Sequence, residues 1–417
     1  METYLKRAAR ILGQINDLAT FSEEAAVLTR TYGTDAYLQA RRCLQQWMAA
    51  AGLQTRIDNI GNVRGRLESP LPNTKTLVIA SHFDTVANAG RFDGPLGVLM
   101  GLDLLAGLAR QPAALPFHLE LIAFCDEEGL RFHTTYLGSK AVAGTLEAAT
   151  LQKKDAAGMT LDQVIRTGGG DPGQLSADAI KPRDWLGYFE IHLEQGPVLY
   201  GKRIPAAVVT AIAGQHRVEV GFNGTAGHAG TVPMAMRRDA LCAAAEFILA
   251  VEQYARNQPE GLVATVGKLH IPHEASNVIP GRVTCSLDLR SADSGPLSSA
   301  ARALEEQAQS ICRHRHLHLD WSLVQQTGPV RCDPALTEIL CQAIRQSGQE
   351  VLGLVSGAGH DAVAIASVAP VAMLFVSCRE GISHHPGEEV SLPDIAASLQ
   401  VAENFIWQCV EKYQPGP

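Results

Sequence analysis

The stretch TLVIASHFD at residues 76–84 begins as a continuous apolar run and ends in ionisable side chains. A short apolar run bounded by polar segments is typical of a strand that is buried on both faces. A second such run spans residues 119–124, and residues 96–109 between the two have a helical pattern. Strand, helix and strand in this order predict a crossover unit of an α/β fold with a mostly parallel sheet.

The pattern changes near residue 214. From there the sequence predicts alternating elements in the order strand 217–222, helix 238–256, strand 262–269, strand 282–290, helix 297–313 and strand 317–326. This β-α-β-β-α-β order is that of the ferredoxin-like unit. The α/β pattern then returns, with helices at 335–347 and 392–413 and a strand at 371–376. We therefore predict an α/β domain of residues 1–213 and 328–417, interrupted by an α+β domain of residues 214–327.

Composition narrows the class of protein. The 417 residues carry 35 basic and 43 acidic side chains, a net charge of −8, which disfavours a nucleic-acid partner. The nine cysteines are scattered without a C-x-x-C pair, as expected in a reducing compartment. Residues 1–15 have the pattern of an amphipathic helix without a signal-peptide core, and no apolar run suits a membrane. We predict a cytoplasmic protein that binds neither nucleic acid nor membrane.

Ionisable side chains gather where predicted strands end. His82 and Asp84 close the first buried strand, and Asp126-Glu127-Glu128 follow the second. Further histidines occur in EIHLEQG at 190–196 and GISHHP at 381–386. Ligands of open α/β sheets bind at these strand ends. One histidine alone is more often structural, and an acidic triplet is usually a solvated helix start. Their conjunction instead predicts a site for borderline divalent metal ions, because adjacent buried carboxylates repel one another without cations.

A second histidine cluster favours a plainer interpretation. His314, His316 and His318 alternate with other residues in RHRHLHLD. If residues 314–323 form one strand, the leucines and Trp321 take its buried face and the histidines its solvated face. The pattern therefore predicts exposed histidines rather than a metal site.

Eight motifs resemble the allantoate amidohydrolase and N-carbamoyl-L-amino-acid hydrolase branch of the zinc aminoacylase and carboxypeptidase-like amidohydrolases. They are SHFDTV at 81–86, RFDG at 91–94, DEEGLRF at 126–132, HLEQGPVL at 192–199, GHAGTVPM at 227–234, SNVIPG at 276–281, SGAGHDA at 356–362 and GISHHPGE at 381–388. Members of this family have a dimetal catalytic domain and an inserted lid domain that forms a homodimer. The resemblance implies both features here.

The resemblance also implies a role for each residue of the site. One divalent ion, Zn²⁺ or Mn²⁺, is expected on His82, Asp93 and His192. A second ion is expected on Asp93, Glu128 and His384, with Asp93 shared between the two. The expected catalytic residues are the general base Glu127, the orienting carboxylate Asp84 and the lid residue His228. The expected substrate-binding residues are Gln195, Arg217, Asn277, Arg290 and His360.

The implied reaction is hydrolysis of a ureido C–N bond in a small carboxylate substrate. The family resemblance around residues 130–135 and at Arg217 favours allantoate, which would give ureidoglycine, ammonia and carbon dioxide. An N-carbamoyl-L-amino-acid hydrolase, or a β-ureidopropionase-like enzyme, is the alternative with the same machinery. A non-enzymatic binding protein on this scaffold is disfavoured, because every expected ligand and the base are present.

Overall fold

The computed structural model describes residues 2–72, 74–110, 115–258 and 261–414, and the chain divides into two compact units. Unit 1 comprises Met1–Thr210, Cys332–Leu354 and Gly359–Pro417, and unit 2 comprises Ala211–Arg331 and Val355–Ala358. Among the described helices, none combines the length and the apolar character that crossing a membrane requires. The assignment of a catalytic domain and a lid or dimerisation domain to these units stays a prediction.

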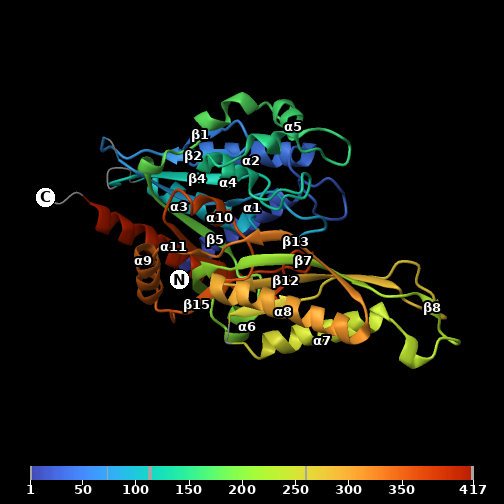
Figure 1. The fold of residues 1–417 in the computed structure, drawn as a ribbon. Helices are drawn as coiled ribbons and strands as arrows, with labels where there is room; N and C mark the ends of the chain where they lie inside the picture. The colour runs from blue at the N-terminus through green and yellow to red at the C-terminus, as the bar shows by residue number, and fades with distance from the viewer. Residues whose placement is uncertain (1, 73, 111–114, 259–260, 415–417) are drawn as a thin grey trace. The chain divides into compact units, whose positions relative to one another are not determined.

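The sheet that the opening motif predicts has its central strands in unit 1 (Figure 1). Its strand order is β1-β2-β4-β3-β5-β16-β6-β14, and β15 pairs with β6. The strands are β1 (Gln54–Ile57), β2 (Val63–Leu67), β3 (Thr76–His82), β4 (His118–Phe124), β5 (Trp185–Leu193), β6 (Ala206–Ile212), β14 (Val330–Arg331), β15 (Gly353–Ser356) and β16 (Val371–Val376). The four central strands β4, β3, β5 and β16 are parallel, which confirms the predicted α/β class. Their carboxyl ends therefore lie along one edge.

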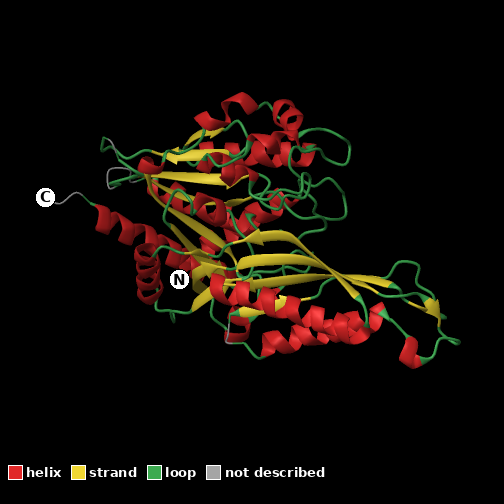
Figure 2. Ribbon diagram, in the orientation of Figure 1, coloured by secondary structure: helices red, strands yellow, loops and turns green. Residues whose placement is uncertain are grey.

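Helices cover this sheet, as Figure 2 shows. The longer ones are α1 (Glu2–Ala19), α2 (Asp35–Ala50), α3 (Pro95–Leu108), α9 (Pro334–Gln346) and α11 (Leu392–Tyr413), and the short ones are α4 (Leu137–Ala143), α5 (Leu161–Thr167), α6 (Val198–Lys202) and α10 (Ala362–Ile365). α3 is apolar apart from Asp103, and 12 of its 14 residues are buried against the sheet and neighbouring helices. α11 begins where Ser391 caps the Asp394 amide.

Unit 2 is a ferredoxin-like α+β unit, as predicted. Its elements are β7 (Gly214–Asn223), β8 (Gly227–His228), α7 (Ala240–Arg256), β9 (Leu262–Thr265), β10 (Leu269–His270), β11 (Val278–Ile279), β12 (Arg282–Ser291), α8 (Ser294–Arg315) and β13 (His318–Thr327). The antiparallel order is β10-β12-β7-β13, with β9 also on β12. α7 and α8 lie side by side along this sheet and share its apolar core (Figure 1). β8 and β11 form a separate two-stranded ribbon.

Two details of the predicted elements are wrong. α8 continues through Arg315, so His314 is helical, and His316 ends the helix in the left-handed conformation at φ 57°. Only His318 of that cluster lies in β13. The register of β13 shifts between Leu323 and Gln325, and Leu323, at the edge of this irregularity, is exposed instead of buried.

The fit of α3 against the sheet can be tested with two glycines of that helix. A Cβ at Gly97 would meet the Ile191 carbonyl oxygen and the Ser81 side chain, whereas the same position at Gly107 is open. We expect Gly97→Ala to destabilise by about 1–3 kcal/mol, because α3 must shift. Gly107→Ala should stabilise by up to about 1 kcal/mol, because alanine favours a helix. Thermal unfolding of both variants checks this, and equal midpoints would contradict the close packing.

Candidate metal centre

Four adjacent parallel strands deliver the candidate ligands to one edge of unit 1. His82 is the last residue of β3, and His192 is the penultimate residue of β5. Glu128 lies just after β4, and His384 lies in the loop after β16. Asp93 comes from the turn before α3, where Gly94 has φ 81° and a Cβ would meet the His82 ring. Glycine is therefore needed to let this turn approach the histidine.

The first ligand group is formed by His82, His192 and Asp93. Asp93 Oδ1 lies 3.3 Å from His192 Nε2 and 3.9 Å from His82 Nε2. The two imidazole Nε2 atoms face each other at 3.4 Å. All three side chains are buried, and their ligand atoms converge within 4.8 Å. Two imidazoles and a carboxylate that converge in this way form a donor set that suits zinc or a similar ion.

The second ligand group shares Asp93 with the first. Asp93 Oδ2 lies 3.0 Å from His384 Nε2, which is 3.4 Å from Glu128 Oε1. Asp93 thus directs one carboxylate oxygen to each group, as a bridging ligand of a two-metal site would. The residues present fit two divalent ions.

The electrostatics of the cluster also fit cations. Burial raises the pKa of Glu128 to about 7 with help from Asp93, and burial and Glu128 raise the pKa of Glu127 well above its usual value. Burial opposes charge on His82, but Asp84, Asp93 and Glu128 outweigh it and raise its pKa to about 9. Burial lowers the pKa of His192 to about 4, although the charge of Asp93 acts in the opposite direction. Without metal, protons on His82 and the glutamates compensate part of the negative charge.

Asp84 holds the acidic loop as well as His82. Its carboxylate accepts the backbone N–H groups of Glu127 at 3.0 Å and Glu128 at 3.2 Å. His82 Nδ1 lies 3.1 Å from the Asp84 backbone carbonyl oxygen and 3.7 Å from its carboxylate. The predicted orienting contact therefore runs mainly through the main chain, and the carboxylate fixes the two glutamates.

Sequence reasoning missed Glu388 and Ser383. Glu388 is buried and accepts the N–H groups of Phe92 at 2.7 Å and Asp93 at 3.0 Å. Its other oxygen accepts the Ser383 hydroxyl at 3.0 Å. These contacts fix the backbone that carries the shared Asp93. The motif GISHHPGE, which ends on Glu388, was the available signal.

Two predicted substrate residues lie beside the ligands in unit 1. Gln195, with φ 55°, donates through Nε2 to both oxygens of Asp93 at 3.2 and 3.1 Å. His360 is buried, and its ring packs edge-on against His192 with 4.4 Å between centroids. Glu190 joins these two histidines as a third convergent group. Both predicted residues are therefore next to the candidate metal ligands.

The other predicted residues belong to unit 2 and form two separate pairs. Arg217 Nε and Arg290 Nε both donate to Asp288, at 3.1 and 2.9 Å. This pair borders a hollow of about 970 Å³ on the open face of the sheet. His228 is exposed on β8, and the Asn277 carbonyl accepts the next amide, that of Ala229, at 2.9 Å. The two pairs flank opposite ends of β12.

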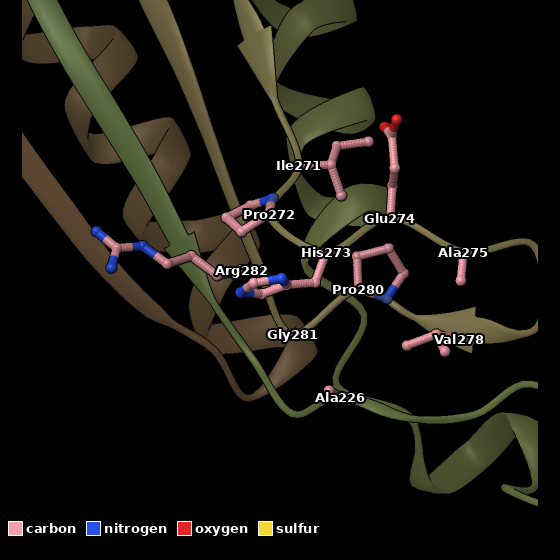
Figure 3. Close-up of a pocket in the computed structure, with 10 residues that line it drawn as sticks. All are labelled: Ala226, Ile271, Pro272, His273, Glu274, Ala275, Val278, Pro280, Gly281 and Arg282. Carbon is pink, nitrogen blue, oxygen red and sulfur yellow. The ribbon is translucent and has the colours of Figure 1, made fainter.

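A smaller hollow of about 430 Å³ lies at the base of the β8–β11 ribbon. Figure 3 shows His273 and Pro280 in the middle of the view, with Arg282 extending to the left and Glu274 extending upward. None of the predicted substrate residues lines it. We therefore do not assign it to the candidate site.

Comparison with known proteins places the chain in a family. Residues 78–408 match the model of peptidase family M20/M25/M40. The chain belongs to this family. A probable allantoate deiminase of Oryza sativa subsp. japonica is 38% identical, over 95% of this chain and 87% of that protein. An N-carbamoyl-L-amino acid amidohydrolase of Geobacillus stearothermophilus is 36% identical, over 92% of this chain and 94% of that protein.

A solved structure agrees with this M20/M25/M40 membership. An amidase of the hydantoinase/carbamoylase family from Burkholderia multivorans superposes with a TM-score of 0.90 and 31% identity, covering 96% of this chain and 97% of that chain. The resemblance seen in the motifs is thus confirmed. Hydrolases of the M20/M25/M40 family use divalent metals, and this chain has ligand groups that suit them.

The electrostatics predict that metal-free protein loses stability between pH 7 and 9. Carboxylate neighbours raise the pKa of His82 and His384 to about 9, and burial raises that of Glu190 to about 8. In this window the folded state keeps protons that the unfolded chain has released. The free energy of unfolding therefore falls as pH rises.

Thermal unfolding of chelator-treated protein at pH 7, 8 and 9 measures this loss. The zinc-loaded protein is the control, and its midpoint should depend less on pH, because the ions replace the protons. A metal-free midpoint that rises over the same range would contradict the electrostatic account.

Proposed function

We propose that the chain is a dimetal amidohydrolase that cleaves a ureido C–N bond of a small carboxylate substrate. The observation that supports this proposal most directly is the pair of ligand groups that share Asp93. The relatives, named as allantoate deiminases and N-carbamoyl-L-amino-acid amidohydrolases, support the ureido class. We favour allantoate, with ureidoglycine, ammonia and carbon dioxide as products. The N-carbamoyl-L-amino-acid or β-ureidopropionase-like reaction is the second candidate.

In this proposal His82, Asp93 and His192 hold one ion, and Asp93, Glu128 and His384 hold the other. Either Zn²⁺ or Mn²⁺ suits these nitrogen and carboxylate donors. Bound divalent ions would supply Lewis acidity toward the ureido carbonyl and the attacking water.

In this proposal the side chains around the metal ligands transfer the protons of the reaction. Glu127 takes a proton from the attacking water and returns it to the leaving nitrogen as the C–N bond breaks. Burial and the neighbouring Glu128 raise its pKa well above the usual value, so the carboxyl group can hold the proton between the two transfers. Asp84 holds Glu127 in place through the backbone contact at 3.0 Å. Gln195 and His360 are polar groups that could bind the rest of the substrate.

The proposal assigns the remaining substrate contacts to unit 2. Arg290 would clamp the substrate carboxylate through paired hydrogen bonds, as guanidinium groups commonly do. Arg217 would bind the second ureido group of allantoate, and His228 and Asn277 would donate to the reacting group. We expect unit 2 to act as a lid that closes over the substrate, as such domains commonly do.

The geometry of unit 2 favours a homodimer. Arg290 lies eight residues along β12 from Arg282, which is at the end of the strand nearer to His228 and Asn277, and eight residues span roughly 26 Å at the usual rise per residue. A small ureido acid cannot span that length, so the two pairs of one chain would serve two different sites. Unit 2 also exposes large apolar side chains that a partner could cover. They are Met234, Met236, Leu249, Leu323 and Val324.

We also propose that the protein is cytoplasmic. All nine cysteines are free thiols, and six of them are buried. Such usage is common in proteins of a reducing compartment.

The substrate assignment is tested by kcat/KM on a panel of ureido acids with zinc- or manganese-loaded protein. We expect allantoate to exceed N-carbamoyl-β-alanine and N-carbamoyl-L-amino acids by several orders of magnitude, because a site built for a polar group rejects analogues that lack it. Arg217→Ala should selectively reduce turnover of allantoate. The control is Glu127→Gln, which should retain metal while kcat falls by roughly two to four orders of magnitude. Preference for a carbamoyl amino acid would favour the second candidate.

Mixed dimers test whether the two pairs serve different sites. Glu127→Gln and His228→Ala chains should each be nearly inactive alone. If His228 acts in the partner's site, subunit exchange creates dimers with one intact site and restores roughly a quarter of wild-type activity at equal mixing. Activity is assayed after exchange has been demonstrated with differently tagged chains. Exchange without recovery would place His228 in its own chain's site or outside the reaction.

A further inference from the structure

Tyr136 has a strained backbone next to the candidate metal centre. It precedes α4 in the left-handed conformation, with φ 64° and ψ 36°. This region is uncommon for an aromatic residue, and glycine or asparagine would enter it more easily. Its side chain makes no capping hydrogen bond to α4. Helix capping therefore does not explain a tyrosine here, and such strain often marks a functional position.

Three successive hydrogen bonds fix Tyr136 to the acidic loop. The amide of Tyr136 donates to the Glu127 carbonyl at 3.0 Å, and that of Leu137 donates to the Asp126 carbonyl at 3.1 Å. Gly138 donates to the Cys125 carbonyl at 3.0 Å, and a Cβ there would meet the backbone of Cys125. These hydrogen bonds fix the first turn of α4 relative to the segment that carries the proposed base.

The phenol hydroxyl of Tyr136 lies against Gly359. A Cβ built at Gly359 would collide with Tyr136 Oη, so the hydroxyl uses the space that the glycine leaves. The next residue, His360, packs against the candidate ligand His192. Among the described residues, no hydrogen-bond partner is found for the Tyr136 hydroxyl, although Lys140 Nζ lies 5.6 Å from the ring centroid. The hydroxyl is therefore available to a ligand.

The surroundings keep this hydroxyl protonated. Burial raises the pKa of Tyr136 strongly, and Glu127, Asp361, Glu190 and Glu128 raise it further. Among so many acceptors, a neutral phenol remains a hydrogen-bond donor at any pH at which the protein is active.

We propose that Tyr136 is a further catalytic residue, whose hydroxyl donates a hydrogen bond to the ureido oxygen of the substrate beside Glu127. This role rests on the proposed function. A general base must lie within hydrogen-bond reach of the water that attacks the ureido carbon. A donor held beside that base is placed to stabilise the negative charge that develops on the ureido oxygen.

The test is Tyr136→Phe in the metal-loaded enzyme, which keeps the ring and removes one oxygen atom. We expect kcat/KM for the preferred ureido acid to fall on the order of 100-fold, mostly in kcat, because the bond strengthens in the transition state. Metal content should stay at the wild-type level. Wild-type kinetics in Tyr136→Phe would overturn the proposal.

Tyr37→Phe is the matched control. It also removes one buried phenol oxygen, which donates to the Gly61 carbonyl at 2.8 Å, and Tyr37 is part of neither ligand group. Its kcat should remain near wild type even if its melting temperature falls. An equal loss of kcat in both variants would reduce the effect of Tyr136→Phe to general destabilisation and overturn the proposal.

Gly359→Ala gives an independent readout, because the added methyl group must displace the Tyr136 hydroxyl. We expect a large loss of kcat in the wild-type background and a much smaller further loss in the Tyr136→Phe background. Equal losses in both backgrounds would contradict the placement of the hydroxyl.

The failure of this inference is distinct from that of the proposed function. If the metal-loaded wild-type enzyme hydrolyses no ureido acid of the panel, the proposed function fails and this role falls with it. If the wild-type enzyme is active and Tyr136→Phe is equally active, only the role of Tyr136 fails.

Discussion

Electrostatic repulsion among buried carboxylates is the constraint that determines how the candidate site is built. Asp84, Asp93, Glu127 and Glu128 converge at the carboxyl edge of the unit 1 sheet, where burial makes every unpaired negative charge costly. Backbone amides neutralise part of this charge, since Asp84 accepts two of them and Glu388 accepts two more. Protons and imidazoles compensate another part. Two divalent ions would satisfy the remainder, and therefore the same residues that destabilise the metal-free site can bind metal tightly.

The backbone around this edge of the sheet adopts strained conformations that bring these side chains together. Asp126, Tyr136, Gln195 and His384 all have φ between 50° and 64° without being glycine. Each lies in or near a loop that follows a central strand, where the chain must turn sharply, and the side chains of Gln195 and His384 reach Asp93. Strain of this kind persists only where surrounding contacts fix it, as the amide bonds from the first turn of α4 do for Tyr136. The strands of the sheet therefore fix where these loops begin, and the strained residues fix how the loops turn.

Much of this arrangement could be predicted because it depends on periodicity along the chain. The runs ending at His82 and Phe124 are apolar on both faces, so their burial and the convergence of the following residues could be read locally. β6 was not predicted, although it is an apolar run of the same kind in which only Thr210 is exposed. His314 was placed in a strand because the sequence gives no sign that α8 continues to Arg315. Glu388 and Tyr136 escaped detection, since their importance depends on contacts with backbone groups far away in the sequence.

The polarity of the site bears on which ureido acid it suits. Besides the ligands, unit 1 places Gln195, His360 and Tyr136 around the cluster, and the predicted Arg217 of unit 2 is also a donor. An apolar amino-acid side chain would offer these polar groups no hydrogen bond, and each polar group that a ligand buries without a partner costs binding free energy. A second ureido group offers a carbonyl oxygen and three N–H groups to the same donors and acceptors. Because rejection of an analogue follows from what the site leaves unpaired, the chemistry of these side chains favours a substrate with two ureido groups over one with a single ureido group and an apolar chain.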